Sequence, residues 1–192
     1  CMDAHIVNGG DGVHQHPTQA LLDLYTMRQS LGKLAGLRVG IVGDVCHSRV
    51  AGSHVPALRK VGATPVLIGP PTLMPARPDV LGAEVAYDLD EVLPSLDVAY
   101  LLRVQFERAA RMPFPSNREY ASLYGLNLAR MAKLPSHAIV MHPGPMNRGV
   151  EITADVADSA QSVILDQVES GVAVRMAVMY LLLGGAEGGA AA

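Results

Sequence analysis

The sequence predicts an α/β fold: a doubly wound parallel sheet, Rossmann-like, with helices on both faces. Two observations support this prediction. Short, almost wholly apolar runs, typical of strands buried on both faces, recur along the chain. Stretches with apolar residues at helical spacing separate these runs. Strands that alternate with helices in this way form βαβ units, and such units build a parallel sheet.

The first helix is expected over residues 17–31. It follows a glycine-rich loop, GDGVHQHP, and its apolar residues recur at helical spacing. Pro17 suits the first turn, because the N–H that proline lacks has no intrahelical partner there. Gly32 suits the end of the helix. Before the loop, HIVN at residues 5–8 is interpreted as a short strand that needs neighbours, so the chain is expected to start inside a domain.

Apolar runs mark the expected strands, and helical patterns lie between them. Proline in the helix at 48–62 is expected to bend that helix or delay its start, because Pro56 lacks an N–H. The last helix, 172–183, is apolar nearly all round, with Arg175 as its one charge, and the small-residue tail after it is expected to be flexible. The expected strands are 37–44, 64–69, 83–88, 97–102 and 138–143, and the other expected helices are 89–96, 117–125 and 126–134.

Composition excludes several classes of function. Aromatic residues make up 4% of the chain, tryptophan is absent and the formal net charge is -3, which argues against nucleic-acid binding. The longest apolar run is too short to span a bilayer, and no secretory signal is visible. Cys1 and Cys46 form no disulfide framework, so a cytoplasmic protein with reduced thiols is expected. Cys46 is expected to be a small buried filler and not a nucleophile.

Polar residues gather where the expected strands end. In a doubly wound sheet, ligands bind beyond the carboxyl ends of the strands, so the loops that begin at Asp44, Arg103 and His142 are expected to face one crevice. Arg49 follows Ser48 at the start of a helix, where backbone N–H groups favour an anion. Two arginines at two strand ends suit a dianionic substrate, because each guanidinium can bind one carboxylate. Arginine is, however, often only surface charge.

Four segments of the chain resemble the C-terminal half of aspartate carbamoyltransferase catalytic chains, from about His5 to Leu183. They are GDGVHQHPTQALLDLYT, GDVCHSRVAGS, LRVQFER and HPGPMNRGVEI, in this order and spacing. The HPTQ motif is shared by other carbamoyltransferases. RVQ and HPGPMNRG favour aspartate over ornithine as the acceptor, because an ornithine enzyme is expected to show HCLP in place of HPGP.

The resemblance implies an activity: transfer of the carbamoyl group from carbamoyl phosphate to the amino group of L-aspartate. The products would be N-carbamoyl-L-aspartate and phosphate, at the start of pyrimidine biosynthesis. The resemblance assigns His16 to the carbonyl oxygen of carbamoyl phosphate and Gln19 to its amino group. A histidine in that place would stabilise the charge that develops on the oxygen. No metal or organic cofactor is implied.

The resemblance also assigns the residues that bind and orient the acceptor. Arg49 and Arg103 would hold the two carboxylates of aspartate, with Gln105 beside them on the same side of an extended backbone. The backbone carbonyls of Pro143 and Gly144 would orient the reacting amine and the carbamoyl nitrogen.

Part of the family's pattern is not found in these 192 residues. A complete chain carries a preceding carbamoyl-phosphate domain, with a Ser-Thr-Arg-Thr motif and a lysine-bearing mobile loop. The terminal helices are expected to pack on that complementary N-terminal half, and the isolated chain is expected to turn over little. A homotrimer of catalytic units is implied, possibly with other pyrimidine-pathway subunits. The expected division is 1–32 for the end of the carbamoyl-phosphate domain and an interdomain helix, 33–170 for the aspartate-binding domain, 171–183 for a C-terminal interdomain helix and 184–192 for a flexible tail.

Other interpretations stay open at this point. The chain could be a non-catalytic structural subunit of the same fold, although its aspartate-side residues are intact, or an ornithine-type carbamoyltransferase. GIVGD resembles part of a dinucleotide-binding loop but lacks the full G-x-G-x-x-G spacing.

Some of the histidines and the last arginine also have other interpretations. His14 and His16 could hold a metal with His5 or His47, yet no Cys or carboxylate stands at a characteristic spacing. A structural role as an interdomain ion-pair anchor is preferred for Arg175. For His142, an alternative is that its side chain only stabilises the Pro-Gly-Pro turn that follows it.

Overall fold

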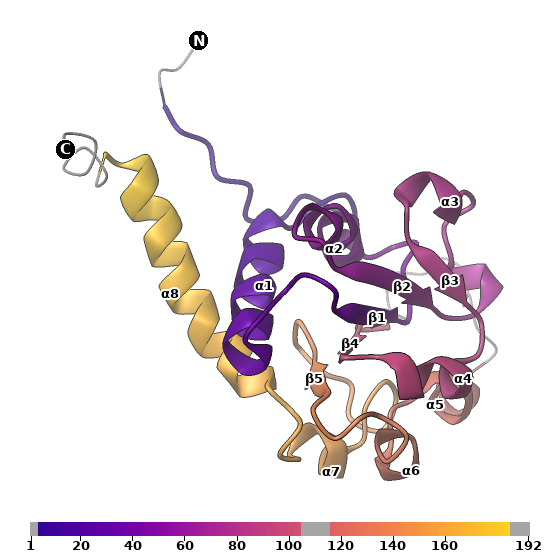
Figure 1. Ribbon diagram of the computed structural model, residues 1–192. Coiled ribbons are helices and arrows are strands. Elements are labelled where there is room, and N and C mark those ends of the chain that lie inside the picture. Colours follow the sequence, from indigo (N-terminus) through magenta and orange to yellow (C-terminus); the bar gives the residue numbers. More distant parts are fainter. Residues whose placement is uncertain (1–3, 105–115, 185–192) are drawn as a thin grey trace.

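A computed structural model describes residues 4–104 and 116–184 of the chain. Its centre is a parallel five-stranded sheet in the order β3-β2-β1-β4-β5, which confirms the predicted doubly wound fold (Figure 1). All five apolar runs form strands, each shorter than the run itself. The strands are β1 (Arg38–Val42), β2 (Thr64–Ile68), β3 (Glu84–Ala86), β4 (Val98–Leu101) and β5 (Ile139–Met141).

The strand order places a topological switch between β1 and β4. Gly40 in β1 lies between Val66 of β2 and Ala99 of β4, and every pairing is parallel. From β1 the chain moves outward to β2 and β3, then returns to the other side of β1 as β4 and β5. The loops that leave β1 and β4 therefore diverge, which opens a crevice at the carboxyl ends of these two strands.

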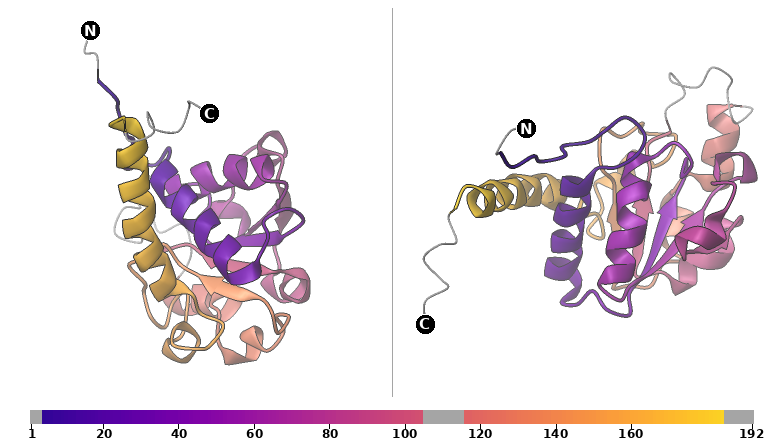
Figure 2. Two further views of the ribbon diagram at one scale, coloured as in Figure 1. Left: turned by 60° about the vertical axis from the view of Figure 1, so that its left-hand side comes forward. Right: turned by 90° about the horizontal axis from the view of Figure 1, so that it is seen from above.

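Helices cover both faces of the sheet. Helices α1 and α2 lie on one face, and α8 lies against the outer side of α1 (Figure 2). The shorter helices α4, α5 and α7 cover the other face. The bounds are α1 (Pro17–Leu31), α2 (Arg49–Lys60), η1 (Pro71–Leu73), α3 (Pro78–Leu81), α4 (Leu89–Val92), η2 (Leu93–Ser95), α5 (Asn117–Tyr124), α6 (Leu128–Met131), α7 (Ala154–Ala157) and α8 (Ile164–Leu182).

The buried side chains form one layer on each face because strand residues alternate in direction. Along β4, Val98 and Tyr100 join the layer under α1 and α2, while Ala99 and Leu101 join the opposite layer. All four are at most 1% exposed. Burial on both faces explains why the strands appear in the sequence as continuous apolar runs.

The ends of α1 and α2 follow from local sequence. Pro17 is the first residue of α1, and Gly32 ends the helix with φ 73° while its N–H donates to the Arg28 carbonyl at 2.9 Å, so both predictions are confirmed. Ser48 caps α2 by accepting a hydrogen bond from the Ala51 N–H at 3.2 Å. Pro56 lies inside α2 and does not delay the start of the helix, which begins at Arg49.

Two sequence-based expectations differ from the structure at the ends of the chain. The strand predicted at residues 5–8 is wrong, because residues 4–10 form no strand. The last helix begins at Ile164 and not at 172. Its first turns contain the polar residues Asp166, Gln167 and Glu169, which interrupt the apolar pattern that marked the rest of the helix.

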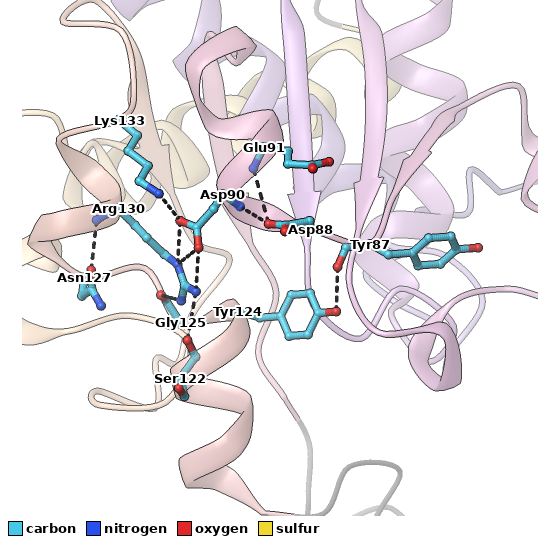
Figure 3. Close-up of polar contacts among 10 residues, drawn as sticks. All are labelled: Tyr87, Asp88, Asp90, Glu91, Ser122, Tyr124, Gly125, Asn127, Arg130 and Lys133. Carbon is cyan, nitrogen blue, oxygen red and sulfur yellow. Dashed lines mark hydrogen bonds and ion pairs between the residues drawn. The ribbon is translucent and has the colours of Figure 1, made fainter.

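An ion cluster joins α4 to α6 near one edge of the sheet (Figure 3). Asp90 lies 3.1 Å from Arg130 Nη2 and 3.0 Å from Lys133 Nζ. The guanidinium of Arg130 also donates to the carbonyls of Gly125 and Ser122, at 2.8 and 2.9 Å. The hydrogen bond from Arg130 is the largest effect that lowers the pKa of Asp90. The cluster thus fixes the segment between α5 and α6 against α4.

Within the described residues, no helix is both long and apolar enough to cross a membrane.

Candidate functional site

A cavity of about 190 Å³ lies at the carboxyl ends of the strands. Pockets for drug-sized ligands occupy roughly 300–1,000 Å³, so this cavity suits a smaller molecule. Its lining comes from the loops after β1, β4 and β5 and from the start of α1, which confirms that these three loops face one crevice. The lining residues are Gly12, His16, Gln19, Asp44, His47, Ser48, Arg49, Val50, Leu102, Arg103, Pro143, Gly144 and Pro145.

His16 stands immediately before α1, at the helix N-terminus. Its backbone N–H donates to the Ser53 hydroxyl of α2 at 2.8 Å. Gly52 permits this approach, because a Cβ there would overlap the His14 carbonyl oxygen. Burial lowers the pKa of His16 below the ordinary 6.5, and the positive charges of Arg49 and Arg175 lower it further. At neutral pH the ring is therefore an uncharged imidazole that donates one N–H.

Gln19 lies in the first turn of α1 and is 7% exposed. Its Nε2 is 3.2 Å from both carboxylate oxygens of Asp23, one turn further along the same helix. The side chain thus has one end in the protein interior, while Gln19 also lines the cavity.

Arg49 is the first residue of α2 and lies half-buried at the cavity. The loop before α1 passes over its guanidinium at Gly10, where a Cβ would lie 2.8 Å from Nη1 and where φ is 124°. Only glycine readily satisfies both conditions. Beside it, buried Asp44 accepts from the backbone N–H of His47 at 3.2 Å and contacts the Nδ1 of that histidine at 2.8 Å.

Arg103 is the second residue beyond β4, and its half-buried side chain lines the cavity opposite the α2 N-terminus. Arg49 and Arg103 therefore meet at one site, as predicted. Gln105 lies outside the described residues. Asp44 is the one carboxylate among the described lining residues, so the arginines make the cavity favourable for anions.

The turn after β5 is fixed by buried polar contacts. The Gly144 N–H donates to His142 Nδ1 at 2.9 Å, and His142 Nε2 lies 3.2 Å from Glu151 Oε1. Both His142 and Glu151 are 1% exposed. The same Glu151 oxygen accepts from the Asn147 N–H at 2.6 Å. His142 therefore braces the turn that brings Pro143 and Gly144 to the cavity.

The expected burial of Cys46 is wrong: its side chain is exposed. The residue lies in the loop between β1 and α2, outside the buried strand. Partial burial, together with the Asp44 carboxylate, raises the pKa of the thiol. A protonated thiol is a poor nucleophile, in agreement with the interpretation that Cys46 has no nucleophilic role.

The other histidines do not gather into one cluster. His14 is 76% exposed and faces Asp11 at 3.4 Å, whereas His47 pairs with Asp44. Among residues 4–104 and 116–184, no group of three His, Cys, Asp or Glu side chains is placed to hold a metal ion.

A buried polar cluster beneath the cavity could not be predicted from the sequence. It is formed by Asp23, His54, Tyr100 and Gln167 with Gln19. Its members come from α1, α2, β4 and α8, so no local pattern joins them. The one available signal was Asp23 itself, a carboxylate at the i+4 position from Gln19 on the buried side of α1.

Comparison with known proteins identifies the family of the chain. Residues 35–182 match the family described as "Aspartate/ornithine carbamoyltransferase, Asp/Orn binding domain". The chain is 60% identical over 185 residues to the aspartate carbamoyltransferase catalytic subunit of Thermobifida fusca, covering 96% of this chain and 59% of that protein. It is 62% identical over 187 residues to that of Salinispora tropica, covering 96% and 61%. The chain thus spans about 60% of the length of these relatives.

Solved structures of the family have the same architecture. Aspartate transcarbamoylase from Trypanosoma cruzi in complex with carbamoyl phosphate is similar with a TM-score of 0.80 at 30% identity, covering 90% of this chain and 57% of that one. Ornithine carbamoyltransferase from Thermus thermophilus is similar with a TM-score of 0.78 at 26% identity, covering 92% and 58%. With the sequence match and the strand-end cavity, these likenesses show that the chain belongs to the aspartate/ornithine carbamoyltransferase family.

Proposed function

We propose that this chain supplies the aspartate side of an aspartate carbamoyltransferase. The enzyme would transfer the carbamoyl group of carbamoyl phosphate to L-aspartate, giving N-carbamoyl-L-aspartate and phosphate in de novo pyrimidine biosynthesis. One observation supports this above all. A single anion-favouring cavity brings together His16, Gln19, Arg49, Arg103 and the Pro143–Gly144 turn. The relatives at about 60% identity are catalytic subunits that use aspartate by name.

In this proposal, carbamoyl phosphate lies at the N-terminus of α1. The neutral ring of His16 donates an N–H to the carbonyl oxygen, which becomes more negative as the amine attacks the carbon. The oxygen of the Gln19 amide accepts from the carbamoyl amino group. The neutral amine forms the new C–N bond, the bond between the carbamoyl carbon and the phosphate oxygen breaks, and phosphate leaves with the electron pair. The proton that the amine loses is taken up by the departing phosphate, so the products are N-carbamoyl-L-aspartate and hydrogen phosphate.

L-aspartate lies on the other side of the cavity. Arg49 and Arg103 each bind one of its carboxylates through paired N–H groups, and the resemblance to the family adds Gln105 to the residues that bind it. The carbonyls of Pro143 and Gly144 accept from the attacking amine and the carbamoyl nitrogen. This arrangement holds the amine next to the carbon it attacks, and such positioning supplies much of the rate acceleration.

The proposed enzyme needs more than the residues of this chain. Helix α8 buries only Ile164, Gln167, Ser170 and Gly171, and many of its apolar side chains are exposed. An apolar groove of about 510 Å³ runs between α1 and α8. Exposed apolar surface of this extent marks an interface. We assign it to the carbamoyl-phosphate half that the family resemblance implies, in a cytoplasmic homotrimer of catalytic units.

Formation of carbamoyl-aspartate tests the proposal. The purified 192-residue chain is assayed alone and after addition of a separately produced carbamoyl-phosphate half, with aspartate and with ornithine as acceptors. We expect product only in the mixture of the two halves, and only with aspartate as the acceptor. Product from ornithine would reassign the acceptor. If neither the isolated chain nor the mixture formed product, and aspartate analogues did not bind, the chain would be a structural subunit of the same fold.

A further inference from the structure

A buried carboxylate lies directly beneath the cavity. Asp23 is 0% exposed. It accepts hydrogen bonds from the Tyr100 hydroxyl at 2.8 Å, from Gln167 Nε2 at 2.7 Å and from Gln19 Nε2 at 3.2 Å. His54 Nε2 lies 2.8 Å from the same carboxylate. Each of these partners is at most 7% exposed. A buried charge is costly unless it is fully hydrogen-bonded, and this one has four partners.

The carboxylate decides which way two amide groups point. An ionised carboxylate only accepts hydrogen bonds, so each glutamine must present its NH₂ end to Asp23. The oxygen of Gln19 is thereby left at the opposite end of its amide, where the residue lines the cavity. The oxygen of Gln167 accepts from the backbone N–H of His142 at 2.9 Å, which requires the same orientation.

His54 encloses the carboxylate from the side of α2. Its Nδ1 lies 2.8 Å from the Val50 carbonyl, which can only accept, so Nδ1 carries a proton. Its Nε2 lies 2.8 Å from the Asp23 carboxylate. The His54 ring is 1% exposed and packs against the Tyr100 ring, with the two centroids 4.6 Å apart. Water therefore has no access to the Asp23 carboxylate from this side.

A continuous path of contacts leads from Asp23 to the other side of the cavity. Gln167 connects Asp23 to the backbone of His142, and the His142 ring accepts from the Gly144 N–H at 2.9 Å. Gln19 and the Pro143–Gly144 turn therefore depend on one carboxylate. In the proposed function, these are the groups that face the carbamoyl nitrogen.

We propose that Asp23 is a positioning residue that makes the site selective for a carbamoyl group. Its carboxylate holds the Gln19 oxygen toward the cavity and, through Gln167, seats the turn after β5. Hydrogen-bond acceptors then converge on the nitrogen of the carbamoyl group. This inference rests on the proposed function, because it takes the Gln19 oxygen as the acceptor of that N–H. Acetyl phosphate, which has a methyl group in place of the amino group, gains nothing from these acceptors.

The variant Asp23→Leu tests the inference. It removes both carboxylate oxygens, so no acceptor remains to hold the NH₂ end of Gln19 in the interior. The oxygen of Gln167 is still held by the His142 N–H, whereas the other end of Gln19 faces the cavity, so Gln19 is the amide expected to turn. The affinity ratio of carbamoyl phosphate to acetyl phosphate is then expected to fall about tenfold, the loss of one hydrogen bond. The ratio is measured by calorimetry on the chain assembled with its carbamoyl-phosphate half.

Tyr100→Phe is the matched control, because it removes a donor from the same carboxylate and leaves both glutamines in place. Stability is expected to fall in this variant while the ratio of affinities stays as in the wild type. Equal weakening of both ligands in Asp23→Leu would indicate a purely structural role and overturn the inference. An unchanged ratio in that variant, or a wild type that prefers neither ligand, would overturn it as well.

A second measurement does not depend on the folding of a variant. In the wild-type assembly, NMR is expected to detect coupling across the hydrogen bond from Gln19 Nε2 to the Asp23 carboxyl carbon, with slow exchange of the amide protons. Fast exchange like that of a surface glutamine contradicts the inference. The proposed function is judged separately: a wild type that prefers carbamoyl phosphate but forms no carbamoyl-aspartate contradicts that function alone.

Discussion

His16 illustrates how a single residue takes its properties from its surroundings. Burial and the positive charge of Arg49 lower its pKa, so the ring carries no charge at neutral pH. The folded pKa is below 6.5, so between the two pKa values the unfolded chain binds more protons than the folded chain. The contribution of His16 to stability is therefore present above about pH 6.5 and decreases as pH falls through that value toward the folded pKa.

Replacement of Arg49 by Met is expected to raise the pKa of His16 toward its ordinary value, because it removes the nearest cation that opposes protonation. An NMR titration of the histidine ring measures the shift. Lys60→Met is the control: it removes a positive charge from the opposite end of the same helix. A pKa that is the same in Arg49→Met and the wild type would show that Arg49 does not contribute to the lowering.

Arg103→Ala is expected to weaken the binding of aspartate analogues at least tenfold, because one carboxylate loses a charged hydrogen-bonding partner worth about 1.5–3 kcal/mol. Carbamoyl phosphate should bind nearly as before, since the proposal places it at the α1 N-terminus. Calorimetry with each ligand measures both affinities. Arg148→Ala, which breaks an exposed pair with Asp158, should change neither. Equal affinity of Arg103→Ala and the wild type for the analogue would exclude this role.

At the scale of elements, the ion cluster of α4 and α6 makes a testable contribution to stability. Arg130 is 11% exposed in its side chain and binds one carboxylate and two carbonyls. Arg130→Met is expected to lower the free energy of unfolding by about 1–3 kcal/mol, because it leaves these acceptors unpaired. Urea denaturation measures this difference. The exposed pair of Arg148 provides the control, and Arg148→Met should cost at most about 1 kcal/mol.

The pH dependence of the same variant follows from Asp90. Arg130 lowers the pKa of this carboxyl below 3.8, so the stabilisation is present above that pH and is lost as pH falls through the folded pKa. The difference between wild type and Arg130→Met should therefore shrink in acid. A difference that stays constant down to pH 2 would mean that the hydrogen bonds to the Gly125 and Ser122 carbonyls and the packing of the side chain, and not the pairing with Asp90, account for the effect.

The exposed face of α8 allows a separate test of the proposed partner half. Val172 and Met176 are each 62% exposed. Lysine at both positions is expected to leave the fold of the chain intact and to prevent its association with the carbamoyl-phosphate half. Light scattering of the mixture measures the association. Leu128→Lys, at an exposed position on α6, is the control. Association of the double variant with normal affinity would place the interface elsewhere.

At the scale of the whole molecule, the sequence predicts the sheet well and the buried polar contacts poorly. The strands were predictable because burial on both faces leaves long apolar runs such as that ending in Val42. The beginning of α8 was not, because Gln167 faces the interior for a partner that lies far away in the sequence. The cluster around Asp23 depends on four elements, so only the folded chain shows it. Gln105 and the division into domains stay predictions.

Helix α1 contributes to two different sites along its length. His16 at its N-cap and Gln19 in its first turn line the cavity, and its later turns form the apolar groove with α8. If the groove receives the partner half, occupancy of the cavity and assembly become thermodynamically linked through one rigid helix. Such linkage is reciprocal: whatever factor the partner adds to the affinity for carbamoyl phosphate, carbamoyl phosphate adds to the affinity for the partner. Substrate supply would then govern how much of the enzyme is assembled.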